Sequence, residues 1–312
     1  MNSPNTNPRV NMKVLIGPSS FAEQDDAPLA LLREAGLEII PNPWKRRYTK
    51  AETITLLQGV RGLIAGLEPL DAEVLRQAHE LKVISRCGVG MSNVDQAEAV
   101  RLGIAVFNTP DGPTDSVAEL TVGAMLAGLR HLPQVNASLH AGNWDKRIGR
   151  LLGSQTVAVV GCGRIGRRVI ALLRGFGCRM IGVDPHVTTA PEGVEMMTLA
   201  EALPLADVIT LHLAGEECIL NREAFAHVKH GVFICNAARG GNVDEVALVD
   251  ALQSGKVARA WLDALSAEPY KGPLQAFDQV ILTPHVASYT AEGRKRMELD
   301  CARNLLRGLG KI

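Results

Sequence analysis

The chain has 312 residues, of which 46% are apolar and 21% are charged, so it is long enough for two domains of ordinary globular composition. This composition excludes intrinsic disorder, collagen and coiled coils. The 33 basic and 33 acidic residues cancel, which gives no long-range attraction to nucleic acid or to an anionic membrane. The aromatic content of 4% is also too low for the stacking surfaces of a single-strand nucleic-acid binder.

Signals for membrane insertion, secretion and metal binding are not found in the sequence. No stretch approaches the roughly 18 consecutive apolar residues of a spanning helix, and residues 1–10 lack the apolar core of a signal peptide. The six cysteines are scattered, with no CxxC pair and no histidine at the spacing of metal ligands. We therefore expect a cytoplasmic protein that has free thiols, holds no metal and binds neither nucleic acid nor membrane.

The first part of the chain alternates apolar runs with stretches of helical periodicity. Strands are expected over residues 12–17, 37–40, 62–66, 82–85 and 104–107. Helices are expected over residues 27–36 and 69–80, the second with Pro69 and Asp71 near its first turn. Such alternation predicts a parallel sheet covered by helices.

The second part repeats this alternation after a long apolar helix, expected from about Ser116 to Leu132 with Ser116 and Glu119 as a capping box. Its strands are expected over residues 155–160, 179–183, 207–213, 231–236, 257–263 and 279–284. An amphipathic helix from about Ala291 to Leu309 closes the chain. The prediction is an α/β protein with two doubly wound parallel-sheet domains.

The sequence GCGRIG places Gly161, Gly163 and Gly166 in a GxGxxG pattern, which is weak evidence alone. Here it follows an expected strand and precedes a helical stretch, and Asp184 ends the next strand, eighteen residues after Gly166. Gly161 permits the tight turn, Gly163 lets backbone amides approach a pyrophosphate, and Gly166 permits close helix packing. The pattern in this context predicts a dinucleotide site.

Asp184 favours NAD over NADP, because a carboxylate accepts hydrogen bonds from the adenosine ribose hydroxyls and repels a 2′-phosphate. His186 leaves NADP open, since a cationic side chain there tolerates phosphate. Ligands of open α/β sheets lie beyond the carboxyl ends of the strands, so side chains that follow later strands should converge on the cofactor. These side chains are Asn236 to Arg239, Asp263, Glu268 and His285.

Several motifs together are similar to the D-isomer-specific 2-hydroxyacid dehydrogenases, and the resemblance covers nearly the whole chain. They are GCGRIG with Asp184, NAARGGNVDE around Arg239, LDALSAEP ending in Glu268 and Pro269, LTPHVAS around His285, SRCGVGMSNVD over residues 85–95, and FNTPDGPTDSVAEL over residues 107–120. The stretches NPWKRRYT (42–49) and AGLEPLDAEVL (65–75) resemble the short phosphoglycerate-dehydrogenase-like branch.

Reduction of a 2-keto acid by NADH needs a cation for the carboxylate, a proton donor for the developing alkoxide, and a group that keeps this donor protonated. Arg239 offers a planar fork suited to a carboxylate, His285 is the candidate donor, and Glu268 would orient and stabilise its ring. The resemblance implies the same three catalytic roles. Taken singly, Arg239 also fits a surface ion pair, His285 an ordinary loop residue, and Glu268 a helix-end or turn residue.

The glycine motif, the strand ends, the charges and the resemblance together predict the contacts with cofactor and substrate. The expected cofactor contacts are Gly161, Gly163, Arg164, Ile165, Gly166, Asp184, His212, Ala237 and Asp263. Backbone amides of Gly88, Val89 and Gly90 would hold the substrate carboxylate. Arg46 would hold a distal phosphate or sulfonate, although residues 45–47 also fit a solvated charge run, and Asp263 also fits a helix cap.

The predicted function is an NAD-dependent oxidoreductase that interconverts a D-2-hydroxy acid and its 2-keto acid, most similar to D-3-phosphoglycerate dehydrogenase. Hydroxypyruvate, glyoxylate or sulfolactate enzymes are alternatives, and an NAD(H)-sensing binding protein is an alternative of another class. Met91, Ser92 and Leu120 depart from common family patterns and leave the particular acid open.

The resemblance also implies an arrangement of domains and subunits. A flavodoxin-like substrate domain (1–114) and a Rossmann NAD-binding domain (115–286) would be separated by a cleft, and residues 287–312 would return to the substrate domain. Dimerisation of identical chains is expected through residues of about 116–142. Because the chain ends soon after its closing helix, no amino-acid-binding regulatory extension is expected.

Overall fold

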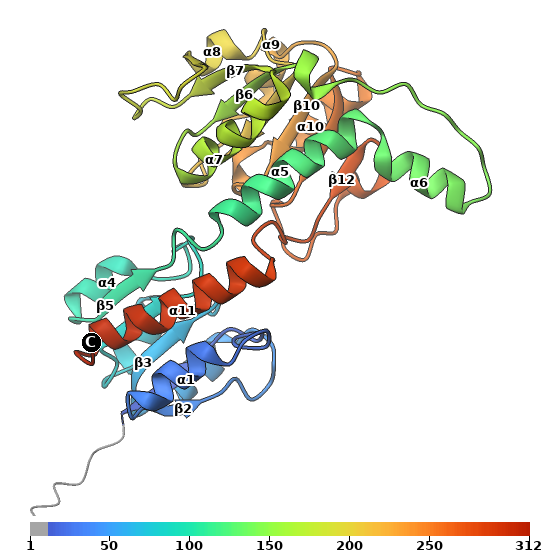
Figure 1. The fold of residues 1–312 in the computed structure, drawn as a ribbon. Coiled ribbons are helices and arrows are strands. Elements are labelled where there is room, and N and C mark those ends of the chain that lie inside the picture. Colours follow the sequence, from blue (N-terminus) through green and yellow to red (C-terminus); the bar gives the residue numbers. More distant parts are fainter. Residues whose placement is uncertain (1–11) are drawn as a thin grey trace, which may run out of the picture. The chain divides into compact units, whose positions relative to one another are not determined.

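The structure, a computed structural model, describes residues 12–312, so the opening segment on which the signal-peptide expectation depends lies outside the described residues. The chain divides into two compact units. One unit contains residues up to Pro113 together with Thr290–Ile312, and the other contains Thr114–Tyr289. Each is built on a parallel sheet covered by helices, which confirms the predicted fold class (Figure 1).

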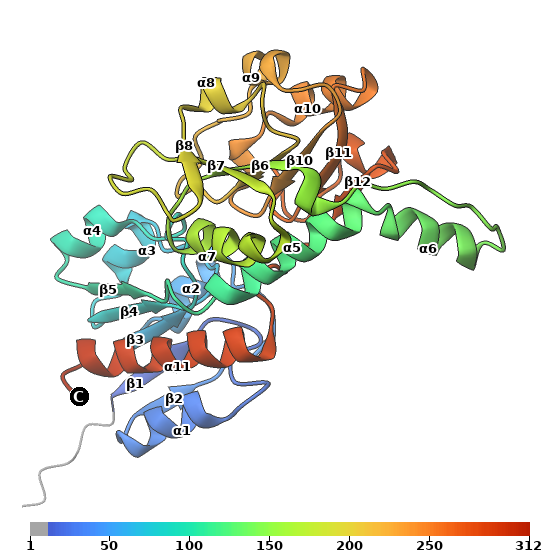
Figure 2. The same ribbon diagram turned by 45° about the horizontal axis from the view of Figure 1, so that its top comes forward.

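The first unit has a five-stranded parallel sheet in the order β2-β1-β3-β4-β5, which is the flavodoxin-like order. Its strands are β1 (Lys13–Ile16), β2 (Glu38–Ile40), β3 (Val60–Ala65), β4 (Val83–Arg86) and β5 (Ala105–Asn108). Its helices are α1 (Ala27–Glu34), α2 (Lys50–Leu56), α3 (Ala72–Gln77), α4 (Gln96–Arg101) and α11 (Ala291–Gly308). The closing helix α11 lies along this sheet in both views (Figures 1 and 2).

Local sequence explains the helices of this unit. Thr49 caps α2 and forms a reciprocal capping box with Glu52, and the side chain of Asp71 caps α3. In α11, Met297, Cys301 and Leu305 recur every fourth residue and are all buried, so one apolar face covers the sheet.

The second unit has a seven-stranded parallel sheet in the order β12-β11-β10-β9-β6-β7-β8. Its strands are β6 (Thr156–Val160), β7 (Arg179–Val183), β8 (Val194–Met196), β9 (Val208–Leu211), β10 (Val232–Asn236), β11 (Val257–Leu262) and β12 (Val280–Leu282). Its α-helices are α5 (Thr114–Leu129), α6 (Leu132–His140), α7 (Arg164–Leu173), α8 (Leu199–Ala202), α9 (Arg222–His227) and α10 (Glu245–Gln253). Short 3-10 turns are η1 (Leu152–Ser154), η2 (Arg174–Phe176), η3 (Gly240–Asn242) and η4 (Pro273–Ala276).

The interior of this unit explains its near-continuous apolar strands. In β6, Val157 and Val159 face one buried cluster, whereas Ala158 and Val160 face the other. A strand that is buried on both faces has no polar alternation. The sheet order reverses at β6, between β7 and β9, so the turn after β6 lies at a topological switch point where ligands of such sheets bind.

All of the predicted strands are present, but three details of the prediction were wrong. Strand β8 was missed because it has three residues and lies at the sheet edge. Helix α5 begins at Thr114, so Ser116 lies inside the helix, 5% exposed, and cannot be the first residue of a capping box. The long helix ends at Leu129, because His131 adopts a left-handed φ of 54° and Pro133 opens α6.

Within residues 12–312, no helix combines the length and the apolarity needed to cross a membrane.

Candidate active site

The turn between β6 and α7 has the geometry that a dinucleotide site requires. Gly161 has a φ of +92°, and a Cβ atom there would lie 2.5 Å from the carbonyl oxygen of His212. A Cβ atom on Gly166 would lie 1.9 Å from the carbonyl oxygen of Gly161. By contrast, a Cβ atom on Gly163 would meet no atom within 4 Å. The turn is therefore closed on its protein side and open at Gly163, as a pyrophosphate needs.

Asp184 follows β7 and ties its strand end to the glycine turn. Its Oδ2 atom accepts a hydrogen bond from the backbone N–H of Cys162 (2.8 Å), and its Oδ1 atom accepts one from the N–H of His186 (2.9 Å). Each carboxylate oxygen can accept a further hydrogen bond, so the group fits the ribose hydroxyls of NAD. The first two residues of α7 are Arg164 and Ile165, which places them at the helix N-terminus beside the turn.

His212 follows β9 and is buried. Its Nε2 atom lies 2.9 Å from the hydroxyl of Thr210, and burial lowers the pKa of the ring to about 3. The imidazole is therefore neutral at physiological pH. Ala237, another predicted contact outside the turn, follows β10 directly. Contacts of these two residues with the cofactor remain predictions.

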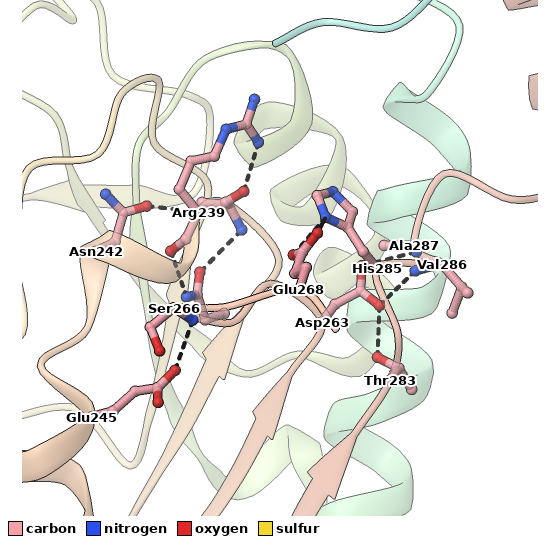
Figure 3. A network of polar contacts seen from close by, with 12 residues as sticks. Arg239, Asn242, Glu245, Asp263, Ser266, Glu268, Thr283, His285, Val286 and Ala287 are labelled. Carbon is pink, nitrogen blue, oxygen red and sulfur yellow. Dashed lines mark hydrogen bonds and ion pairs between the residues drawn. The ribbon is translucent and has the colours of Figure 1, made fainter. Parts of the chain in front are cut away.

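Arg239 lies three residues after β10, at the carboxyl edge of the sheet (Figure 3). Its backbone N–H donates to Oδ1 of Asn242 (3.0 Å), and its carbonyl accepts from the side-chain amide of Asn236 (2.8 Å). The guanidinium donates to the carbonyl of Ala238 (2.7 Å) and extends beyond the strand ends. The backbone of Arg239 is thus fixed on both sides.

Glu268 and His285 come from different loops and meet side by side (Figure 3). The Nδ1 atom of His285 lies 2.9 Å and 3.1 Å from the two carboxylate oxygens of Glu268. About half of each side chain is exposed, 48% for His285 and 44% for Glu268. Because Nδ1 faces the carboxylate, Nε2 is the ring atom left for proton transfer to a ligand.

Asp263, which directly follows β11, organises the turn that carries His285. It is 2% exposed and accepts hydrogen bonds from the Thr283 hydroxyl (2.6 Å) and from the backbone N–H groups of Val286 and Ala287 (both 2.9 Å). The indole of Trp261 in turn donates to the Thr283 hydroxyl (3.0 Å). Sequence reasoning missed Thr283, whose only signal is its position directly after β12. A contact of Asp263 with the nicotinamide carboxamide remains a prediction.

The loop that carries Glu268 packs against the segment that carries Arg239. The Glu245 carboxylate accepts a hydrogen bond from the N–H of Ser266 (2.8 Å). A Cβ atom on Gly240 would lie 2.0 Å from the carbonyl oxygen of Leu265. These two contacts bring the three predicted catalytic residues to one region of the second unit.

The predicted substrate residues belong to the first unit. Gly88 has a φ of +139°, and its N–H donates to the Thr109 hydroxyl (2.8 Å), which leaves the N–H groups of Val89 and Gly90 for a ligand. The guanidinium of Arg46 forms two hydrogen bonds with the Glu52 carboxylate, at 2.6 Å and 2.9 Å. Its role in binding a distal anion therefore stays a prediction. Among residues 12–312, no group of three or more His, Cys, Asp or Glu side chains is placed to hold a metal.

The second unit is therefore a dinucleotide-binding α/β domain with an arginine and a carboxylate–histidine pair at later strand ends. Residues 122–287 match the model of the family described as D-isomer specific 2-hydroxyacid dehydrogenase, NAD binding domain. The chain belongs to the D-isomer specific 2-hydroxyacid dehydrogenase family, and NAD is the cofactor of this domain.

Three similar proteins illustrate this membership. The D-3-phosphoglycerate dehydrogenase of Rattus norvegicus is 40% identical over 276 residues, which are 85% of this chain and 51% of the relative. The hydroxypyruvate reductase of Thermotoga maritima is 37% identical over 248 residues, 77% of this chain and 81% of the relative. The crystal structure of the TT0316 protein from Thermus thermophilus has a TM-score of 0.88 at 34% identity and covers 96% of this chain and 97% of that one. The chain spans about half the length of the phosphoglycerate dehydrogenases that it matches.

Proposed function

We propose that the protein is an NAD-dependent dehydrogenase that interconverts a D-2-hydroxy acid and its 2-keto acid. The hydrogen-bonded pair of His285 and Glu268 at the carboxyl edge of the NAD-binding sheet carries this proposal. A histidine held through Nδ1 by a carboxylate presents Nε2 for proton transfer. Membership of the family supports the same chemistry.

In the reductive direction, bound NADH supplies the hydride. Arg239 binds the substrate carboxylate through its planar guanidinium and polarises the keto group. His285 donates its Nε2 proton to the alkoxide oxygen as negative charge develops there. Glu268 orients the ring and stabilises the imidazolium before the proton leaves. In the oxidative direction His285 takes the proton back from the hydroxyl group.

For the cofactor, Gly161, Gly163 and Gly166 would place backbone amides against the pyrophosphate, and Asp184 would bind the adenosine ribose. The open space at Gly163 and the spare acceptor capacity of Asp184 support this assignment. A 2′-phosphate beside Asp184 would be repelled, so we propose that NAD is preferred over NADP.

Two types of substrate are candidates. The first is a 2-hydroxy acid of the type used by D-3-phosphoglycerate dehydrogenase, which the names of many relatives support. Reduction of hydroxypyruvate or glyoxylate is the second candidate. This second candidate is favoured because the guanidinium of Arg46, which a distal phosphate would need, already forms an ion pair with the Glu52 carboxylate. The Thermotoga maritima relative is named for hydroxypyruvate reduction.

Absorbance of NADH during incubation with a panel of 2-keto acids tests the activity. The panel contains hydroxypyruvate, phosphohydroxypyruvate, glyoxylate, sulfopyruvate and pyruvate. We expect oxidation of NADH with at least one acid, and a D-configured product for every acid except glyoxylate, whose product is achiral. Retained NADH binding without turnover of any acid would instead indicate an NAD(H)-sensing binding protein.

We further propose that the protein is a homodimer that works in the cytosol. Helix α6 has no buried residue, and both views show it standing away from the sheet of its unit (Figures 1 and 2). Large apolar side chains on and beyond it are exposed, namely Leu132, Leu139, Trp144, Ile148 and Leu151. A second copy of the chain is the partner that would cover them. The five buried free cysteines support a reducing compartment.

A further inference from the structure

Glu68 occupies a topological switch point in the first unit. In the strand order β2-β1-β3-β4-β5, neighbouring strands β1 and β3 lead to connections that run in opposite directions. Ligands of open parallel sheets bind beyond the carboxyl ends of the strands at such a point. Gly17 follows β1 and Gly66 follows β3, so these two glycines mark the place.

The carboxyl group of Glu68 fills the space between these two strand ends. Glu68 is 1% exposed, and both of its carboxyl oxygens accept the backbone N–H of Gly66, at 2.9 Å and 3.0 Å. A Cβ atom on Gly17 would lie 2.3 Å from Oε1 of Glu68. The backbone N–H of Gly66, which could otherwise bind an anionic ligand, is therefore already bound by the carboxyl group of Glu68.

The same carboxyl group faces cations close to the predicted substrate loop. Arg86 is the last residue of β4 and is 8% exposed. Its guanidinium lies next to the predicted substrate loop, because a Cβ atom on Gly88 would lie 2.6 Å from its Nη1 atom. Burial raises the pKa of Glu68, and the positive charges of Arg86 and Arg47 act in the opposite direction. Burial together with the negative charge of Glu68 raises the pKa of the Tyr48 phenol. The guanidinium of Arg86, next to Gly88, thus acts on the Glu68 carboxyl group within the same unit.

We propose that Glu68 excludes a second anionic group from the substrate, so that the acid has a short uncharged side chain, as in hydroxypyruvate or glyoxylate. This inference rests on the proposed dehydrogenase function and selects the second of its two substrate candidates, hydroxypyruvate or glyoxylate, over the phosphorylated acid. A phosphate at the switch point would have to displace the Glu68 carboxyl group from Gly66, and the ionised form of this group would also repel it. A hydroxymethyl group or a hydrogen atom meets neither obstacle.

Hydroxypyruvate and phosphohydroxypyruvate differ only by the phosphate, so the ratio of their kcat/KM values with NADH isolates its effect. We expect the wild-type protein to favour hydroxypyruvate. Glu68→Gln keeps the shape and removes the charge, so it should raise the relative efficiency with phosphohydroxypyruvate by about tenfold or more. Glu68→Asp keeps the charge and should retain the preference for hydroxypyruvate.

Glu98→Gln is the matched control. Glu98 is also a buried carboxylate of the first unit, but Arg76 and Arg101 hold it between α3 and α4. Its replacement should leave the ratio of the two substrates unchanged. Wild-type preference for phosphohydroxypyruvate, or an equal ratio in Glu68→Gln and Glu98→Gln, would overturn the proposal.

A binding measurement separates this inference from the proposed reaction. Calorimetric titration of the NADH-loaded wild-type protein with D-glycerate and with 3-phospho-D-glycerate needs neither turnover nor a variant. Tighter binding of D-glycerate supports the role of Glu68, and tighter binding of the phosphorylated acid contradicts it. Failure of both keto acids to oxidise NADH would count against the dehydrogenase, while the titration still decides the role of Glu68.

Discussion

The ring of His285 and the carboxylate of Glu268 form a hydrogen-bonded pair. The backbone of His285 is itself held in place by Asp263. His285 has a φ of 54°, uncommon for a non-glycine residue, and its N–H donates to the carbonyl of Asp263 (3.0 Å). The Asp263 carboxylate also binds the next two backbone N–H groups. Glu268 therefore sets the ring and Asp263 sets the turn, which is typical of a side chain held for chemistry.

Three glycine substitutions separate the fold of the dinucleotide turn from its ligand. Gly166→Ala places a Cβ atom 1.9 Å from the Gly161 carbonyl, so it should destabilise the second unit by roughly 1–3 kcal/mol and abolish NADH binding. Gly163→Ala meets no protein atom and should melt like the wild type but lose NADH affinity. Gly175→Ala is the control and should change neither property. Thermal melting and NADH fluorescence titration measure both, and normal NADH binding by Gly163→Ala would refute the pyrophosphate assignment.

Substitution of Asp184 should relax the preference for NAD. In Asp184→Asn the side-chain oxygen still accepts the N–H of Cys162, but the charge that repels a 2′-phosphate is gone. The ratio of NADPH to NADH dissociation constants should fall by about tenfold. Glu195→Gln, which removes an exposed carboxylate paired with Arg179 on the same unit, should leave the ratio unchanged. An unaltered ratio in Asp184→Asn would count against its role.

Buried neutral His212 should make the second unit acid-sensitive. The pKa of His212 is about 3 in the folded chain and has its ordinary value of 6.5 in the unfolded chain. Between these two pH values, the unfolded chain binds a proton at this residue and the folded chain does not. Stability is therefore lost as pH falls from about 6.5 towards 3, by about 2 kcal/mol at pH near 5. Urea unfolding of His212→Asn should show a smaller loss between pH near 7 and pH near 5. Exposed His227→Asn should behave like the wild type, and equal losses in all three proteins would refute this account.

The exposed apolar side chains beyond α6 predict the oligomeric state. Ile148 is 98% exposed and Trp144 is 79% exposed, so Ile148→Asp should dissociate a dimer formed through this segment. Val100→Asp, at a 77% exposed apolar position in the first unit, is the matched control and should remain dimeric. Sedimentation velocity distinguishes the two states. A monomeric wild type, or a dimeric Ile148→Asp variant, would contradict the predicted interface.

The sequence predicts most of this structure because the features concerned are local. Strands buried on both faces are continuous apolar runs, and the glycine turn has a fixed spacing from Asp184. Glu268 and His285 follow strands β11 and β12, and parallel strands end at one edge, so their meeting could be anticipated. The parallel sheet therefore brings residues that are distant in the sequence together at one edge.

The features that sequence analysis missed depend on contacts between distant segments. Thr283 and the turn-forming role of Asp263 require β11 and β12 to be paired. Glu68 resembles an ordinary loop residue, and only the adjacency of β1 and β3 shows that it is buried against Gly66. Sequence analysis placed the start of α5 two residues late because Ser116 matches a capping pattern. In the structure Ser116 is a buried residue within the helix.

The rate of keto-acid reduction by His285→Gln at saturating NADH tests the central claim most directly. Gln cannot donate an acidic proton, so the rate should fall by about 10²–10⁴-fold while the NADH dissociation constant stays within about twofold of the wild-type value. Glu268→Gln should give an intermediate rate. Turnover by His285→Gln at the wild-type rate would contradict the assignment of this residue as the proton donor.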